Sequence, residues 1–310
     1  MKSNYFPDPL GIRKSAVNAL KDSKFVSINQ EKIKEFAQNI KEKIENNELV
    51  DEWQFGKFEK TSQHIFIQDT VNFCFWAKKN EKKWKVEYPK GKIEDGWKAL
   101  VNCFDRAHEE RIPIDDCEFL EDISLEQVKN IFRSCNGTEI PLLEKRWELL
   151  KESGKVLRQK FEGNIINLIK KADFDAIEIA KNVVKYFPSF RDPFYKRAQI
   201  FPYDVSLLKN MRIKNTNQLT AFADYRLPQI LREFGVLAYK KELAEKIDSY
   251  ILLKSGNHKE TEIRSATIIA CDLIAKEIKV MPVTAENALW SLSQKWKSQH
   301  PYHRILTTNY

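Results

Sequence analysis

The sequence predicts a mainly α-helical protein with a minor β component. Glycine is scarce, at 9 of 310 residues, whereas turn-rich all-β folds usually need more of it. Apolar residues recur at helical spacing in several stretches, and strand signals are few. With 42% hydrophobic and 31% charged residues, the chain can form a sizeable core in one large domain or two modest ones.

The first helical signals lie in the middle of the chain. Apolar residues from Ile93 to Phe104 fall on one helical face, and Pro113 stops the run. Ser124 and Gln127 form a capping-box pair at the start of the next helix. The dipeptide Asn136-Gly137 is a good C-cap, and we expect that helix to end there.

Three further helices are expected towards the C-terminus. A charged helix with apolar positions is predicted over residues 142–160, and another over residues 263–274. Thr284 is a candidate N-cap for a short helix that holds Leu289 and Trp290.

Other segments are ambiguous or irregular. Ile65–Trp76 is rich in β-branched and aromatic residues, and it fits either a strand pair or a buried helix. Trp84–Tyr88 alternates and predicts a short strand. Phe187–Pro193 must be irregular because two prolines interrupt it, and it could form a pocket wall or a buried connection.

Charge and cysteine content limit the class of protein. The net charge is +8, but 52 basic and 44 acidic residues are interspersed, which favours a mixed surface over one basic nucleic-acid-binding face. Five cysteines without a C-x-x-C motif argue against a disulfide framework or a thiolate zinc site. No signal peptide is recognised at the start and no apolar run is long enough to cross a bilayer, so we expect a cytoplasmic location.

Familiar catalytic motifs are absent from the sequence. It contains no nucleophile elbow, P-loop, dinucleotide-binding glycine motif or zinc-protease motif. His300 and His303 lie close together, but further metal ligands cannot be located, so no metal site is predicted.

Acidic residues in apolar surroundings remain as candidates for catalysis or ligand binding. Asp69 and Asn72 lie inside an apolar stretch, where they either tie the backbone together or face a ligand. Asp224, between Phe222 and Arg226, is either half of a structural Asp–Arg pair or a carboxylate held ionised in an apolar pocket. The same alternatives apply to Lys196, Arg197 and Asp204.

An ordered series of segments resembles the queuosine-salvage family, the queuosine 5′-phosphate N-glycosylase/hydrolases. The segments are Asp69–Trp76, Phe187–Asp192, Tyr195–Ile200 with Asp204, Phe222–Gln229, Glu262–Arg264, Leu289-Trp290 and Pro301–Arg304. We therefore expect a single domain over residues 1–310. Residues 51–310 would be the family region, and residues 1–50 a helical extension packed on it.

The resemblance implies a fold distantly similar to helix-hairpin-helix DNA glycosylases. It implies hydrolysis of queuosine 5′-monophosphate to queuine and ribose 5-phosphate, without a metal or redox cofactor. The expected form is a monomer with no stable nucleic-acid partner and no membrane. Glu286 departs from the pattern, because an aspartate is expected at that position.

Site roles follow from this chemistry. The transition state is oxocarbenium-like, so Asp224 is predicted to stabilise its positive charge. Two other roles for Asp224 stay open, those of nucleophile and of general base. A 7-deazapurine lacks the N7 that assists departure of purines, which places more weight on the sugar side. Asp69, Asn72 and Asp204 are predicted to contact the base edge, and Glu286 the queuine amine. Phe222 and Trp290 are predicted either to stack on the base or to belong to the core. His64, Lys196 and Arg197 are predicted to contact the phosphate, and Arg226 to support ionised Asp224.

Two other classes compete with the hydrolase. The first is a nucleic-acid-binding helical protein or a glycosylase acting on a polynucleotide, suggested by the sequence pI of about 9.0. The second is a helical scaffold without catalysis, which leaves acids in aromatic stretches unexplained.

Overall fold

The computed structural model describes residues 6–46, 48, 49, 56 and 60–310. The chain divides into two compact units. Unit 1 comprises Met1–Glu52 and Asn215–Leu306, and unit 2 comprises Trp53–Lys214 and Thr307–Tyr310. In its described part each unit is mainly helical with one two-stranded sheet, which confirms the predicted class. The similarity to helix-hairpin-helix glycosylases remains a prediction, as does the single-domain organisation.

Unit 1 combines the N-terminal segment with a segment from the last third of the sequence. Its elements are α1 (Ile12–Lys21), β1 (Val26–Ile28), α2 (Gln30–Glu45), the 3-10 turn η3 (Thr216–Gln218), α11 (Arg226–Glu233), β4 (Leu237–Tyr239), α12 (Lys241–Asp248), α13 (His258–Ile278) and α14 (Pro282–Lys295). The strands pair antiparallel, with Ser27 opposite Ala238.

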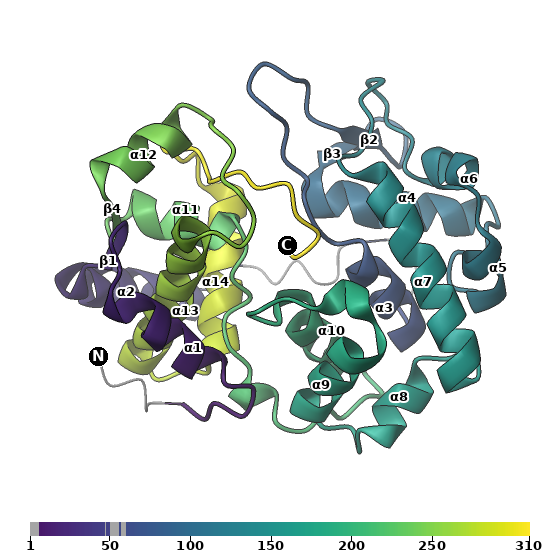
Figure 1. Cartoon of the computed structure of the whole chain (residues 1–310), viewed down its shortest axis with the longest axis horizontal. Helices are drawn as coiled ribbons and strands as arrows, with labels where there is room; N and C mark the ends of the chain where they lie inside the picture. Colours follow the sequence, from purple (N-terminus) through teal and green to yellow (C-terminus); the bar gives the residue numbers. More distant parts are fainter. Residues whose placement is uncertain (1–5, 47, 50–55, 57–59) are drawn as a thin grey trace. The chain divides into compact units, whose positions relative to one another are not determined.

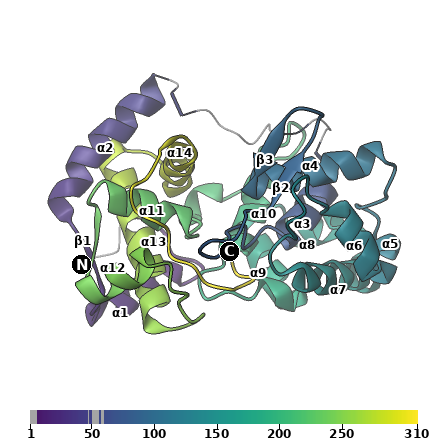
Figure 2. The same ribbon diagram turned by 90° about the horizontal axis from the view of Figure 1, so that it is seen from above.

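Helix α13 is the centre of unit 1. It packs against α1, α2, α11 and α14 (Figures 1 and 2), and most of its residues are buried. Its buried charges have partners, as such burial requires. Glu262 accepts from the backbone N–H of Phe25 at 2.7 Å and of Val26 at 3.1 Å, and Asp272 pairs with Arg13 at 2.8 Å. These contacts fasten the N-terminal segment to the central helix.

Unit 2 contains the middle of the chain and its last four residues. Its elements are α3 (Ser62–Thr70), β2 (Lys85–Glu87), β3 (Ile93–Asp95), α4 (Gly96–Glu109), α5 (Cys117–Asp122), α6 (Leu125–Ile131), α7 (Leu143–Phe161), α8 (Ile166–Lys171), α9 (Ala176–Tyr186), the 3-10 turn η2 (Pro188–Phe190) and α10 (Lys196–Ser206). Strands β2 and β3 are antiparallel.

Helix α3 occupies the core of unit 2 and packs against α4, α7 and α10. Phe66 on α3 stacks on Phe190 with ring centroids 5.5 Å apart, and it also contacts Phe187 and Phe201. The segment Phe187–Pro193 is irregular, as predicted, and its phenylalanines Phe187 and Phe190 are fully buried. It therefore contributes two aromatic rings to this core, while its Pro188, Arg191 and Pro193 are exposed.

Two predicted helix boundaries in unit 2 are wrong. The sequence placed Ile93 on the helical face, but Ile93 belongs to β3 and is 55% exposed. Helix α4 therefore begins only at Gly96. Helix α6 has the predicted capping box but ends at Ile131. Beyond it, Cys135 donates its backbone N–H to the Lys85 carbonyl, and this contact with β2 replaces continuation of the helix to Asn136-Gly137.

Other elements differ in detail from the expectation. The ambiguous stretch Ile65–Trp76 is helical as far as Thr70 and irregular after it. Helix α14 begins at Pro282 with Met281 as N-cap, so Thr284 lies inside the helix and does not cap it. Proline suits the first helical position because its missing N–H would have no intrahelical partner there. The helices predicted over residues 142–160 and 263–274 are confirmed by α7 and α13.

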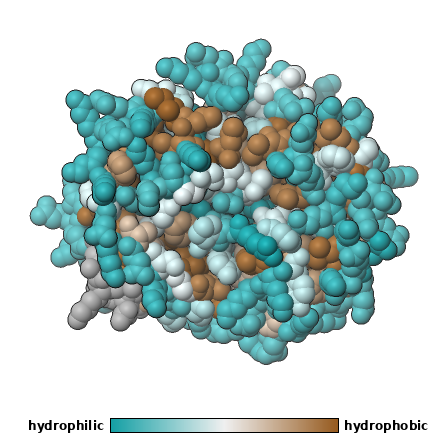
Figure 3. All heavy atoms as spheres, viewed as in Figure 1, coloured by the Kyte–Doolittle hydropathy of each residue, from teal (hydrophilic) through white to brown (hydrophobic). Residues whose placement is uncertain are grey.

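The surface and the helix lengths bear on the class of protein. Figure 3 shows hydrophilic residues over much of the displayed face, with groups of hydrophobic residues between them. Within the described ranges, we find no helix that combines the length and apolar character needed to span a bilayer.

Candidate active site

Asp224 precedes α11, and its carboxylate caps that helix. Oδ1 accepts backbone hydrogen bonds from Arg226 at 2.7 Å and from Leu227 at 3.0 Å. These bonds satisfy two of the N–H groups that a helix start leaves without intrahelical partners. Oδ2 has no hydrogen bond to any described residue, and Asp224 is 9% exposed. The carboxylate is thus held in a fixed orientation by one oxygen while the other remains available.

The predicted Asp–Arg side-chain pair is not formed among the described residues. The guanidinium of Arg226 lies 3.4 Å from Gln229 Oε1 and 5.7 Å from the centre of the Tyr302 ring. Arg226 instead holds Asp224 through its backbone N–H. Backbone donors therefore orient the Asp224 carboxylate, and the first of the two alternatives, the structural Asp–Arg pair, is not formed.

Helix α13 supports the Asp224 segment from within unit 1. Arg264 donates from Nε to the carbonyl of Ala223 at 3.1 Å, which fixes the residue before Asp224. Burial, together with the carboxylates of Glu286, Asp272 and Asp224, raises the pKa of the Cys271 thiol well above its usual value. The carboxylates of Asp224 and Glu286 therefore both lie close enough to Cys271 on α13 to disfavour ionisation of its thiol.

The other predicted residues of unit 1 lie on neighbouring elements. Phe222 is buried in the segment before α11. Glu286 and Trp290 lie one turn apart on α14, and Glu286 is buried while Trp290 is half-buried. The predicted stacking and amine contacts stay predictions.

Among the described residues of unit 2, Asp69 has a strongly shifted carboxyl pKa. It lies near the end of α3, and its Oδ2 is buried without a hydrogen-bond partner among the described residues. Burial raises its pKa to about 7, against the opposing effects of Lys196, a hydrogen bond from the Asn72 side chain, and Arg197. The structure thus brings together Asp69, Asn72, Lys196 and Arg197. A buried carboxyl that titrates near neutral pH is typical of functional sites.

Arg197 and Lys196 begin α10, and their settings differ. Arg197 donates from Nη1 to the carbonyls of Thr70 at 2.7 Å and Asp69 at 3.2 Å, and burial lowers its pKa to about 10. Much of its donor capacity therefore holds the end of α3. Lys196 is buried, and its positive charge opposes the rise in the pKa of Asp69. Its backbone N–H donates to the Asp192 carboxylate at 2.9 Å. Asp204 lies further along α10 and is half-buried.

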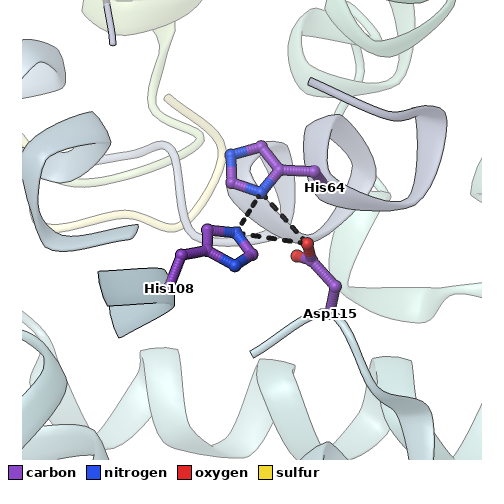
Figure 4. Close-up of side chains that lie close together, drawn as sticks. All are labelled: His64, His108 and Asp115. Atoms are coloured by element: carbon purple, nitrogen blue, oxygen red, sulfur yellow. Dashed lines mark hydrogen bonds and ion pairs between the residues drawn. The ribbon is translucent and has the colours of Figure 1, made fainter. Parts of the chain in front are cut away.

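Both ring nitrogens of His64 have polar neighbours, and Figure 4 shows those at Nδ1, which are His108 and Asp115. Nδ1 lies 3.2 Å from Asp115 Oδ2 and 3.0 Å from His108 Nε2, and Nε2 lies 3.2 Å from the Gln68 amide nitrogen. Burial would raise the pKa of the Asp115 carboxyl, but hydrogen bonds to His108 and His64 outweigh it and lower the pKa to about 2. Among the described residues, these three form the one group suited to hold a metal ion.

Sequence reasoning missed His108 and Asp115. They follow His64 by 44 and 51 residues, and no local motif links the three. His108 lies in the last turn of α4, and the tight turn after the helix, in which Arg111 has φ of 57°, returns the chain so that Asp115 meets the histidine. The short spacing from His108 to Asp115 was the available signal, but it has no meaning without the position of α3.

Comparison with known proteins identifies the family. Residues 53–310 match the family model described as queuosine salvage protein. A Bos taurus protein named queuosine 5′-phosphate N-glycosylase/hydrolase is 35% identical over 84% of this chain and 83% of its own length. Proteins of the same name from Mus musculus and Sphaerobacter thermophilus are each 34% identical, over 77% and 86% of this chain and 79% and 85% of their own lengths. The chain belongs to the queuosine salvage protein family.

Proposed function

We propose that this protein hydrolyses the N-glycosidic bond of queuosine 5′-phosphate, releasing queuine and ribose 5-phosphate. The observation that carries the proposal is the shared name of relatives from animals and a bacterium, which match this chain over most of its length. The oriented carboxylate of Asp224 supports it, since such a reaction needs a fixed negative charge.

The reaction places its main demand on the sugar. As the C1′–N9 bond breaks, its electron pair leaves with the base, and positive charge develops on the ribose. The oxygen of a water molecule forms the new bond to C1′, and the base takes up a proton. We assign charge stabilisation to Asp224, whose Oδ2 remains available after Oδ1 has capped α11. The same atom could orient or deprotonate the water.

Substrate contacts are proposed on the same chemical grounds. In unit 1, Phe222 and Trp290 are assigned to stacking on the base and Glu286 to the cationic amine of queuine. Arg226 is assigned to fixing Asp224 through its backbone N–H.

In unit 2, Lys196 and Arg197 are assigned to the phosphate, because both are cationic and begin one helix. Asp69, Asn72 and Asp204 are assigned to hydrogen bonds with the base edge. For Asp69 the support is an unpartnered buried oxygen, and for Asn72 its hydrogen bond to that carboxyl.

Hydrolysis by this route requires no metal ion or redox cofactor at the reacting bond, because the attacking group is water and Asp224 supplies the charge. We further propose a monomeric cytoplasmic enzyme without a stable nucleic-acid partner. The five free cysteines support a reducing compartment.

The test is release of base from three compounds. Purified protein is incubated with queuosine 5′-phosphate, queuosine and guanosine 5′-monophosphate, and products are separated by chromatography. We expect queuine from the modified nucleotide and no guanine from the unmodified one. Guanine release at a comparable rate would contradict the assigned substrate, and no release from any compound would contradict hydrolysis.

The competing polynucleotide function has a separate test. A nucleic-acid binder would bind tRNA with an affinity that falls steeply with salt, because binding releases counterions. We expect no salt-sensitive tRNA binding, and base release from the free nucleotide that does not require tRNA.

A further inference from the structure

We propose that His64, His108 and Asp115 form a binding site for a divalent transition-metal ion of the Zn²⁺ class in unit 2. The three ligand atoms are His64 Nδ1, His108 Nε2 and Asp115 Oδ2. They come from α3, the end of α4 and the loop that follows α4 (Figure 4). The site goes beyond the proposed hydrolysis and is independent of it.

The distances between these atoms match one face of a tetrahedron around zinc. His64 Nδ1 and His108 Nε2 are 3.0 Å apart, and they lie 3.2 Å and 3.3 Å from Asp115 Oδ2. Ligand atoms placed tetrahedrally at about 2.0 Å from Zn²⁺ are about 3.3 Å from one another. An ion could therefore bind with little movement of the three side chains.

Hydrogen bonding alone does not satisfy all three contacts. If both ring nitrogens carry protons aimed at Asp115, two N–H donors oppose each other across 3.0 Å. If one proton is removed, a bare nitrogen lone pair faces the Asp115 carboxylate at close to 3.3 Å. A cation among the three atoms removes both conflicts, since it accepts a lone pair from each of them.

Neighbouring groups hold the ligands in place. Phe104 on α4 contacts the His64 ring edge-on, with centroids 5.4 Å apart. Gln63 donates to the backbone carbonyl of Asp115 at 3.1 Å, which links the loop to α3. The Gln68 amide nitrogen lies 3.2 Å from His64 Nε2, and turning the amide over would put its oxygen there to accept the N–H that a metal-bound imidazole presents.

Ligand chemistry selects the ion. Two imidazoles and one carboxylate suit Zn²⁺ and similar transition metals, whereas Mg²⁺ and Ca²⁺ prefer oxygen ligands. A fourth position would be taken by water or by Asp115 Oδ1, which is buried without a hydrogen-bond partner in the described structure. The ion would link α3, α4 and the following loop. It would also give His64 a role other than the phosphate contact predicted from the sequence.

The direct test is metal binding by the intact protein. Protein purified without a histidine tag is stripped with a chelator and reconstituted with Zn²⁺ or Co²⁺. We expect about one ion per chain by elemental analysis and the visible d–d absorption of four-coordinate Co²⁺. At Zn²⁺ concentrations about 100-fold above Kd, the melting temperature should rise by about 5 °C.

Variants locate the ion. His108→Gln and Asp115→Asn should each lose the Co²⁺ spectrum and the Zn²⁺-dependent rise in melting temperature, with helix content by circular dichroism as the folding check. His258→Gln replaces an exposed histidine at the start of α13 and should retain both signals. Wild-type protein that binds neither ion would overturn the proposal, and so would an ion that persists in both site variants.

Base release from queuosine 5′-phosphate, measured on the same samples, separates this proposal from the hydrolase assignment. We expect the chelated protein to retain hydrolysis below its melting temperature. Metal binding without hydrolysis would support the metal site and contradict the proposed function. Hydrolysis without metal binding would support the proposed function and contradict the metal site.

Discussion

The carboxylate of Asp224 accepts a hydrogen bond from the backbone N–H of Leu227 at 3.0 Å, within the first turn of α11. With the N–H of Arg226 on the same oxygen, this bond determines which way the second oxygen faces. The residue proposed for catalysis therefore also has a structural role, and the two roles use different oxygens.

The structural role of Asp224 predicts a difference between two substitutions. Asparagine retains a side-chain oxygen that can cap α11, whereas alanine does not. We expect Asp224→Ala to lower the free energy of unfolding by about 1 kcal/mol, and Asp224→Asn to change it by a few tenths at most. Denaturant titration of both variants measures this. Equal losses would show that Oδ1 does not stabilise the helix start.

The ion pair between Arg13 and Asp272 predicts a large stability effect in unit 1. Arg13 is 1% exposed, bonds both carboxylate oxygens and also donates to the Leu219 carbonyl. Arg13→Met leaves a buried carboxylate unpaired and should cost about 3–5 kcal/mol of unfolding free energy.

Two controls accompany that measurement. The double variant Arg13→Met with Asp272→Leu removes both charges and should recover part of the loss. Lys32→Met breaks an exposed pair with Glu35 and should have no measurable effect. A loss in the double variant as large as in Arg13→Met would show that burial of an unpaired charge is not the cause.

Asp69 predicts a pH dependence of stability in unit 2. Its pKa is raised from 3.8 to about 7 by burial, so the folded state retains a proton that the unfolded state releases. The contribution of Asp69 is therefore fully present below pH 3.8 and is lost as the pH rises towards 7. Each pKa unit of difference corresponds to about 1.4 kcal/mol.

The Asp69→Asn variant tests this sign. Unfolding free energies of wild type and variant are compared at acidic and at neutral pH. We expect the variant to gain stability relative to wild type as the pH rises between these limits. A constant difference across the range would show that Asp69 titrates as it does in the unfolded chain.

Lys196 predicts a specific effect on substrate preference. A charge-assisted contact to phosphate contributes about 1.5–3 kcal/mol, so Lys196→Gln should raise KM for queuosine 5′-phosphate by about tenfold or more. KM for queuosine, which lacks the phosphate, should change little. Lys170→Gln, an exposed position on α8, is the control. Equal changes for both substrates would place Lys196 away from the phosphate.

Much of the secondary structure followed from local signals. The capping box at Ser124 and the apolar spacing of α7 and α13 are properties of short segments, and the structure has all three. The wrong N-cap at Thr284 overlooked a local signal, Pro282, but other predictions were wrong where contacts distant in sequence decide. The end of α6 is an example, because the bond from Cys135 to Lys85 depends on β2.

The candidate site was also predictable only where local sequence carried the signal. Asp224 and Asp69 stood out because acids in apolar stretches need an explanation, and the structure finds both substantially buried. The backbone bonds of Asp224 were not predictable, since the sequence suggested the Arg226 side chain as its partner. The group His64, His108 and Asp115 could not be recognised, because it exists only when α3 lies beside the end of α4.

The most direct test of the central claim compares single-turnover rates of queuine release from queuosine 5′-phosphate by wild type, Asp224→Asn and Asp175→Asn. Asp175 caps α9 through the same kind of bonds, to the N–H groups of Ile177 and Glu178, and has no assigned catalytic role. We predict a loss on the order of 10³-fold for Asp224→Asn, about 4 kcal/mol of transition-state stabilisation, and no loss for Asp175→Asn. A folded Asp224→Asn variant that releases queuine at the wild-type rate would contradict the assignment of Asp224 as the catalytic carboxylate.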